Sequence, residues 1–110
     1  LEVLGAPTTY SASKAALLAH AKAISIPMAG KQIRVNTVSP GNMIFPGSTW
    51  EDKLKQNPDA VKKMLEHDVA LKRLGTAKEV ARVITFLSSP AASFVCGSNW
   101  VVDGGQLRAI

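Results

Sequence analysis

Two side chains near the start of the chain have the types and the spacing of an acid–base pair. Tyr10 and Lys14 stand four residues apart, a spacing that places them on one face of a helix. A free phenol has a pKa of about 10 and is a poor proton donor at neutral pH. An ammonium about 4 Å away contributes roughly 4 kcal/mol at an effective dielectric of about 20, which favours the phenolate and lowers that pKa. Tyr10 could therefore exchange a proton with a substrate oxygen.

The same spacing also suits an ordinary helix start. On that interpretation Tyr10 is a half-buried aromatic residue and Lys14 is a solvated residue of the first turn. The elements around the pair have to decide between the two interpretations.

An alanine-rich segment from Ser11 to Ala29 follows the tyrosine. Alanine is the best helix former, so the segment predicts a helix. Gly30 is a natural stop just past its end, and Pro27 should kink the helix or end it early. Apolar residues spread around most of its circumference, which is typical of a helix buried on more than one face.

Two short strands are expected further along. Residues 33–41 are rich in β-branched side chains, which predicts a strand at 33–38. Pro40-Gly41 closes the segment. A second strand is expected at Asn99 to Val102, followed by a turn at Asp103-Gly104-Gly105. Strands joined through a helix pair in parallel with a right-handed crossover.

Helical patterns fill most of the chain between the strands. Residues 42–50 are predicted to be irregular, and residues 51–67 to form one or two short amphipathic helices broken near Asn57-Pro58. Thr76 to Ser88 predicts a helix that opens with a capping box of Thr76 and Glu79.

These elements predict an α/β fold that needs more chain. Two strands make a poor sheet, and the strand at 33–38 would have an open apolar edge. Parallel strands normally belong to a sheet with helices on both faces. We therefore expect the C-terminal part of a larger doubly wound α/β domain. The first residues, from Leu1, look like the continuation of a preceding segment.

Composition argues against several function classes. The chain is 46% hydrophobic and 19% charged, as in globular proteins, and no apolar run approaches the roughly 20 residues of a membrane span. Its net charge of +5 is scattered and aromatic residues make up only 5%, which argues against nucleic-acid binding. The single Cys96 excludes an internal disulfide and a cysteine-built zinc site; no metal is expected. It also fits a reducing, cytoplasmic compartment.

Three stretches together resemble the classical short-chain dehydrogenase/reductase family. "YSASKAAL" is similar to its Tyr-x-x-x-Lys helix and "IRVNTVSPG" to its sixth strand and Pro-Gly turn. "RLGTAKEVARVITFLSSPAASFVCGSNWVVDGG" is similar to its last helix and strand. The resemblance covers nearly the whole chain in the right order. It implies that residues 1–110 are the C-terminal portion of one NAD(P)-binding, Rossmann-like domain.

The family's chemistry is hydride transfer between NAD or NADP and a carbonyl or alcohol. The resemblance implies that Tyr10 is the general acid/base and that Lys14 assists it and binds the nicotinamide ribose. It adds Pro40, Gly41 and Met43 to the cofactor site, with glycine allowing backbone to approach the ligand and Met43 offering main-chain groups to the carboxamide. An ordinary turn is the alternative for Pro40-Gly41.

Residues 42–68 fall where the family keeps its substrate lid. The resemblance makes Asn42, Phe45 and Trp50 substrate-binding residues. Phe45 stands where the family pattern often has a threonine, which makes the pocket more apolar. Trp50 and Met64 could instead fix the lid to the core.

The family's glycine-rich phosphate-binding turn, catalytic serine and catalytic asparagine have no counterpart in this chain. The expected partners are a small carbonyl or alcohol substrate and further copies of the chain, as a homodimer or homotetramer, or the missing N-terminal half. The alternative is a catalytically incomplete fragment that acts as an oligomerisation or binding module.

Overall fold

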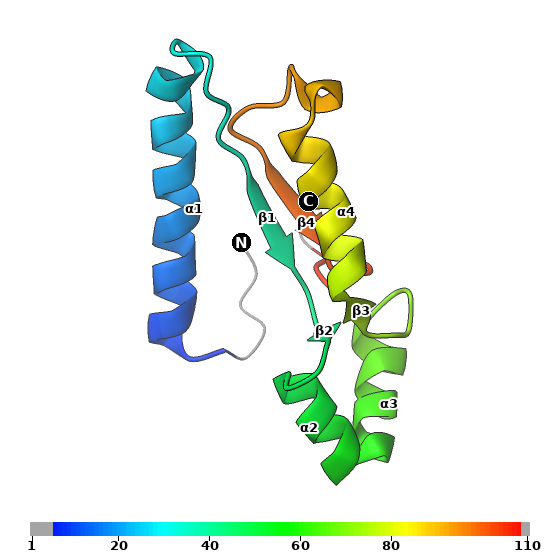
Figure 1. The fold of residues 1–110 in the computed structure, drawn as a ribbon. Coiled ribbons are helices and arrows are strands. Elements are labelled where there is room, and N and C mark those ends of the chain that lie inside the picture. The colour runs from blue at the N-terminus through cyan, green and yellow to red at the C-terminus, as the bar shows by residue number, and fades with distance from the viewer. Residues whose placement is uncertain (1–5, 109–110) are drawn as a thin grey trace.

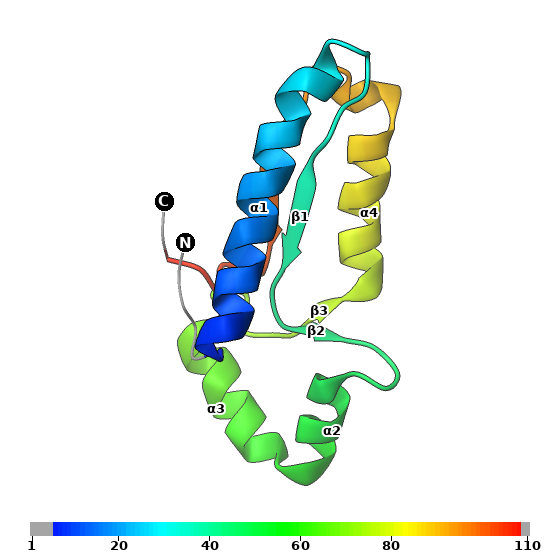
Figure 2. The same cartoon turned by 90° about the vertical axis from the view of Figure 1, so that its left-hand side faces the viewer.

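Helices lie on both sides of a parallel ladder of two strands. The computed structural model describes residues 6–108. The strands β1 (Thr37–Pro40) and β4 (Asn99–Val102) stand between α1 (Thr8–Ala29) and α4 (Ala77–Ser88), as Figures 1 and 2 show from two sides. This arrangement confirms the predicted α/β class.

The ladder between β1 and β4 is parallel, as predicted, but β1 is shorter than residues 33–41. Its register runs from Thr37 opposite Asn99 to Pro40 opposite Val102. Residues 33–36 lie outside the ladder, because the side chains of Arg34 and Asn36 bond to other parts of the chain. The Arg34 guanidinium donates to the carbonyls of Leu87 and Val95 at 2.8 and 3.2 Å. Arg34 thereby ties the C-terminal end of α4 to the start of β1.

Helix α1 starts earlier than predicted and ends where predicted. It begins at Thr8, so Tyr10 lies inside it, and it continues through Pro27 to Ala29, with Gly30 as the C-cap residue. The expectation that Pro27 ends the helix early is wrong. A proline removes one backbone donor, and only two helical residues remain beyond it, so the loss is small.

The first part of the chain between β1 and β4 forms two helices, α2 (Thr49–Gln56) and α3 (Pro58–Asp68). The Ser48 hydroxyl accepts from the Glu51 N–H at the start of α2, and the Asn57 side chain accepts from the Ala60 N–H at the start of α3. The break predicted near Asn57-Pro58 is confirmed. We call residues 42–68 the lid, which lies beyond the carboxyl end of β1 in Figure 1.

A second, unpredicted ladder connects the start of the lid to the chain that follows it. β2 (Met43–Ile44) pairs in parallel with β3 (Gly75–Thr76), and the Gly75 N–H donates to the Asn42 carbonyl at 2.9 Å. The expectation of irregular chain over 42–50 is wrong here. The partner strand is far away in sequence, so no local pattern reveals the pairing. We call β2 and β3 the neck of the lid.

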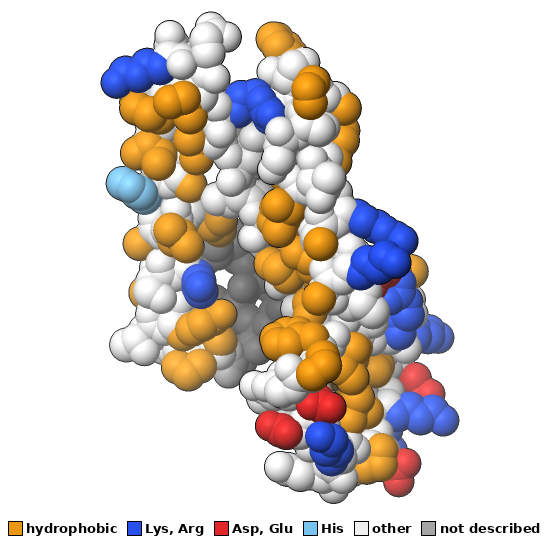
Figure 3. Space-filling view, in the orientation of Figure 1, with side chains coloured by type: hydrophobic (Ala, Val, Ile, Leu, Met, Phe, Trp, Pro, Cys, Tyr) orange, Lys and Arg blue, Asp and Glu red, His pale blue; other side chains and the backbone are white. Residues whose placement is uncertain are grey.

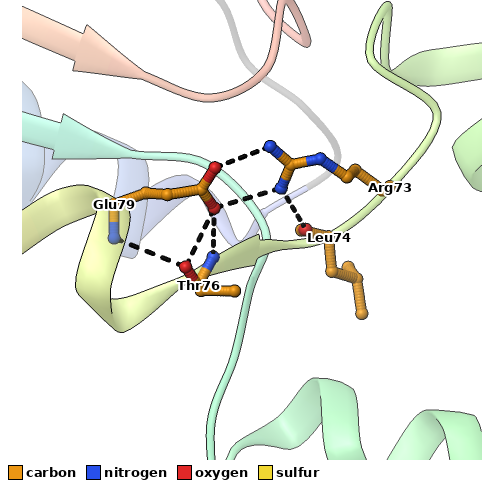
Figure 4. A network of polar contacts seen from close by, with 4 residues as sticks. All are labelled: Arg73, Leu74, Thr76 and Glu79. Carbon is orange, nitrogen blue, oxygen red and sulfur yellow. Dashed lines mark hydrogen bonds and ion pairs between the residues drawn. The ribbon is translucent and has the colours of Figure 1, made fainter.

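The predicted capping box at the start of α4 is confirmed and extended by an arginine (Figure 4). The Glu79 carboxylate accepts from the Thr76 N–H at 2.9 Å, and the Thr76 hydroxyl accepts from the Glu79 N–H at 3.4 Å. The Arg73 guanidinium donates to both Glu79 carboxylate oxygens, at 2.6 and 3.0 Å. Arg73, followed by the Thr76 backbone and hydroxyl, lowers the pKa of Glu79 from 4.5 to about 2.

The core is thin in the part of the chain that the structure describes. Five apolar residues are buried, namely Val61, Val69, Leu74, Leu87 and Ala92. The last lies in a short 3-10 helix, η1 (Pro90–Ala92). Many large apolar side chains stay exposed instead, and Figure 3 shows them spread along α1 and over the opposite helix. Among residues 6–108, no helix is long and apolar enough to span a bilayer.

The shifted pKa of Glu79 predicts an acid-sensitive helix start. A carboxyl whose folded pKa lies below its unfolded pKa stabilises the fold fully above about 4.5 and loses that contribution as the pH falls toward 2. Glu79→Gln should therefore flatten the fall of the urea midpoint between these pH values. Glu66→Gln in α3 is the control. A wild-type slope in Glu79→Gln would contradict the prediction.

The close approach of the two strand ends predicts that Gly41 tolerates no side chain. A Cβ there would lie 2.7 Å from the Asp103 Cβ, so Gly41→Ala should lower the free energy of unfolding by about 1–3 kcal/mol. Gly30→Ala is the matched control, because its nearest neighbour is 3.7 Å away and its φ is −62°. Urea unfolding measures both; equal stability of the two variants would contradict the packing argument.

Candidate active site

The first turns of α1 bring Tyr10 and Lys14 onto one face. The Ser11 N–H donates to the Pro7 carbonyl at 3.0 Å and starts the helical ladder. One turn separates the two side chains, and the Lys14 Nζ lies 5.5 Å from the centroid of the Tyr10 ring. Tyr10 is 55% exposed, and Lys14 is exposed as well. The two groups are adjacent and accessible to a ligand.

The position of this pair within the fold matters as much as its spacing. The N-terminal end of α1 lies at the same end of the molecule as the carboxyl end of β1 and the lid (Figure 1). In open α/β sheets, ligands bind beyond the carboxyl ends of the strands. Tyr10 and Lys14 therefore stand at the end where this architecture places its chemistry.

The Pro40-Gly41 turn lies at the same end, against the turn after β4. The Gly41 N–H donates to the Val102 carbonyl at 3.0 Å, and a Cβ on Gly41 would meet Asp103. The close approach that requires glycine is thus to another part of the chain. The Asp103 carboxylate accepts from the N–H groups of Gly105 and Leu107, which makes Asp103-Gly104-Gly105 the turn that the sequence predicts.

The neck fixes the orientation of the peptide between Asn42 and Met43. Its carbonyl points at β3, where it accepts from the Gly75 N–H. A trans peptide is planar, so the Met43 N–H points the opposite way. Within residues 6–108, β2 has a strand on one edge only. The other edge presents the Met43 N–H and carbonyl, a donor and an acceptor that match the oxygen and NH₂ of a carboxamide, so the turn fits a nicotinamide.

An open hollow of about 550 Å³ lies beside this turn, between the lid and residues Gln106 and Arg108. Asn42 and Trp50 both line it, together with Met64 from α3. The Lys53 Nζ lies 4.3 Å from the Trp50 ring centroid, which places a cation at the same wall. Asn42, Trp50 and Met64 are therefore brought together at one open hollow.

Phe45 does not share this hollow. Its side chain is 49% exposed and lines neither the hollow nor the cavity behind the neck. Its N–H donates to the Ser48 hydroxyl and its carbonyl accepts from the Ser48 N–H. In this structure the residue belongs to the turn that starts α2.

A second cavity, of about 490 Å³, lies behind the neck and was not foreseen from the sequence. Met43 and Gly75 line it from the neck, and Arg73, Glu79 and Asp103 complete its polar wall. The capping box pointed to Glu79 only as a helix start. Nothing in the local spacing places residues 70–75 beside β4, because that contact depends on the fold.

The structure does not join all the expected site residues. No described hydrogen bond or ring contact connects Tyr10 or Lys14 with residues 40–43, and neither cavity includes the two α1 side chains. The Tyr10–Lys14 pair and the turn share one end of the molecule but remain separate there. No group of three or more His, Cys, Asp or Glu residues between 6 and 108 is placed to hold a metal ion.

Comparison with known proteins gives this arrangement a family. Residues 2–106 match a family model described as enoyl-(acyl carrier protein) reductase. The chain is 46% identical over 99 residues to isoepoxydon dehydrogenase of Penicillium expansum, an alignment that covers 90% of this chain and 38% of that protein. The chain thus spans well under half the length of this relative.

Solved structures agree in fold and in extent. L-sorbose reductase from Gluconobacter frateurii, complexed with NADPH and L-sorbose, superposes with a TM-score of 0.85 at 28% identity over 97% of this chain and 43% of that one. A 4-hydroxyisoleucine dehydrogenase complexed with NADH gives a TM-score of 0.83 at 29% identity, over 97% of this chain and 43% of that one. The described elements correspond to part of a Rossmann-like α/β sheet, and the chain belongs to the short-chain dehydrogenase/reductase family.

Proposed function

We propose that this chain is the C-terminal part of an oxidoreductase that moves a hydride between NAD or NADP and a carbonyl or alcohol substrate. The observation that carries the proposal is the Tyr10–Lys14 contact on one helix face, at the carboxyl end of the β ladder. The relatives, named as dehydrogenases and reductases, support the reaction class.

Tyr10 is the proposed general acid/base. In the direction of reduction its hydroxyl gives a proton to the substrate carbonyl oxygen; in oxidation the phenolate takes the proton from the alcohol. Lys14 supplies a positive charge one helical turn away, which stabilises the phenolate.

The neck and turn are proposed to hold the nicotinamide end of the cofactor. Met43 would bind the carboxamide through its outward N–H and carbonyl, next to Pro40 and Gly41. Lys14 and Tyr10 would contact the nicotinamide ribose from α1. The bound nicotinamide supplies or accepts the hydride. The similar solved structures are complexes with NADPH or NADH, which supports a dinucleotide without choosing between the two.

The hollow of the lid is the proposed substrate site. Asn42 brings an amide to its wall and Trp50 an aromatic face, beside the charged groups of Lys53, Asp68 and Arg108, so the site offers an aromatic surface together with several polar groups. Phe45 would take part only if its exposed ring turned toward the substrate.

The bare apolar surface supports a larger domain. Leu17 and Ile26 on α1 are 55% and 72% exposed, and β1 has one partner strand among the described residues. We propose that residues 1–110 complete a single NAD(P)-binding domain whose N-terminal half covers this surface and binds the phosphates. The same exposed helix also suits the alternative role, an oligomerisation or binding module; further copies of the chain as partners stay a prediction.

Removing the phenol hydroxyl tests the catalytic proposal. In the complete polypeptide, Tyr10→Phe should lower kcat/KM by about 10²–10⁴-fold, the usual contribution of a positioned acid–base group. Thermal stability should be unchanged because the ring is exposed. His20→Gln, on the same helix, is the control. Full turnover in Tyr10→Phe would exclude the catalytic role, and an inactive wild-type protein would favour the binding module.

A pair of lid variants tests the substrate site. Trp50→Ala should raise KM for the carbonyl substrate about tenfold with kcat less affected, the pattern of lost ground-state binding. Phe45→Ala, the loss of another aromatic ring outside the hollow, should change KM about twofold or less. Steady-state kinetics at saturating cofactor measures both. A larger effect at Phe45 than at Trp50 would place the substrate elsewhere.

A further inference from the structure

We propose that Gly75 is a positioning residue for the nicotinamide: its N–H and its lack of a side chain hold the Met43 peptide in the orientation that binds the carboxamide. This inference rests on the proposed function, since it assigns a task to a residue outside the turn that would contact the cofactor. Gly75 follows the lid in sequence, more than thirty residues after Met43, and touches no cofactor in this account.

One hydrogen bond sets the orientation of the Asn42–Met43 peptide. The Gly75 N–H donates to the Asn42 carbonyl at 2.9 Å. Because the peptide is planar and trans, this bond also decides where the Met43 N–H points, which is away from β3. A rotation of that peptide would break the Gly75 bond and turn the Met43 N–H away from its proposed ligand.

The Met43 side chain fills the space beside the Gly75 Cα. A Cβ on Gly75 would overlap the Met43 Sδ and lie 2.8 Å from its Cε, so the flexible end of the Met43 side chain would have to move. The backbone of Gly75 does not lie in the left-handed region, so a side chain there would act through this contact and not through backbone strain. Met43 sits directly opposite Gly75 in the ladder, and its thioether occupies the place that a side chain would take.

The residues on either side of Gly75 are hydrogen-bonded to the start of α4. Arg73 and Thr76, on either side of it, both bond Glu79 in the first turn of α4 (Figure 4). The Arg73 guanidinium also donates to the Leu74 carbonyl at 3.2 Å. A donor fixed to a helix start can hold the Asn42–Met43 peptide still while α2 and α3 respond to substrate.

Binding measurements on the complete polypeptide test the proposal. Gly75→Ala keeps the N–H but displaces the Met43 side chain from its place on β2, so it should weaken NADH or NADPH binding about fivefold, no more than the usual worth of one hydrogen bond. Its affinity for ADP-ribose, or for the 2′-phosphorylated form if NADPH is preferred, should stay within about twofold because that ligand lacks the nicotinamide. The double variant Gly75→Ala/Met43→Ala should bind NAD(P)H more tightly than Gly75→Ala, since it removes the side chain that the new Cβ meets.

Two further controls keep the result decisive. Gly75→Pro removes the N–H itself and should weaken NAD(P)H binding at least as much as Gly75→Ala; if it does not fold, the alanine series decides. Gly30→Ala, at the C-cap of α1 and with no neighbour nearer than 3.7 Å, is the control and should bind NAD(P)H like the wild type. Equal weakening toward ADP-ribose, or unchanged NAD(P)H affinity in Gly75→Ala, would overturn the proposal. A wild-type protein that binds neither dinucleotide would instead overturn the proposed function on which it rests.

Discussion

The parallel ladder between β1 and β4 is the interaction on which the other elements depend. It closes where Gly41 lies against Asp103, too near for any side chain on residue 41. At its other end the Arg34 guanidinium bonds the carbonyls that end α4. Fixed at both ends, the two strands set the place of the Pro40-Gly41 turn, and the neck of the lid continues from it. The ends of the strands therefore fix the turn at which the proposed cofactor site lies.

Local patterns predicted those elements whose determinants lie close together in the sequence. The capping box of Thr76 and Glu79 and the break at Asn57-Pro58 are of this kind, because each hydrogen bond joins residues three apart. The i, i+4 relation of Tyr10 and Lys14 also needs only a helix. The fold class followed from the order of such elements, and its Rossmann-like character from resemblance.

Features that depend on distant residues were missed or misplaced. The neck joins Met43 to Gly75, and the cavity behind it gathers residues from three parts of the chain. Pro27 is tolerated because so little of α1 follows it, and residues 33–36 leave the ladder because Arg34 and Asn36 bond elsewhere. The contact of Gly41 with Asp103 is likewise one that no local pattern indicates. Each case depends on what the fold places opposite the residue.

Hydride transfer is the central claim, and isotope transfer tests it most directly. The complete polypeptide would be incubated with NADH or NADPH carrying deuterium at both C4 positions and with a panel of cyclic and medium-sized ketones. The product alcohol should carry one deuterium on the former carbonyl carbon, detected by mass spectrometry. Tight binding of the dinucleotide with no deuterium transferred to any ketone would contradict this claim.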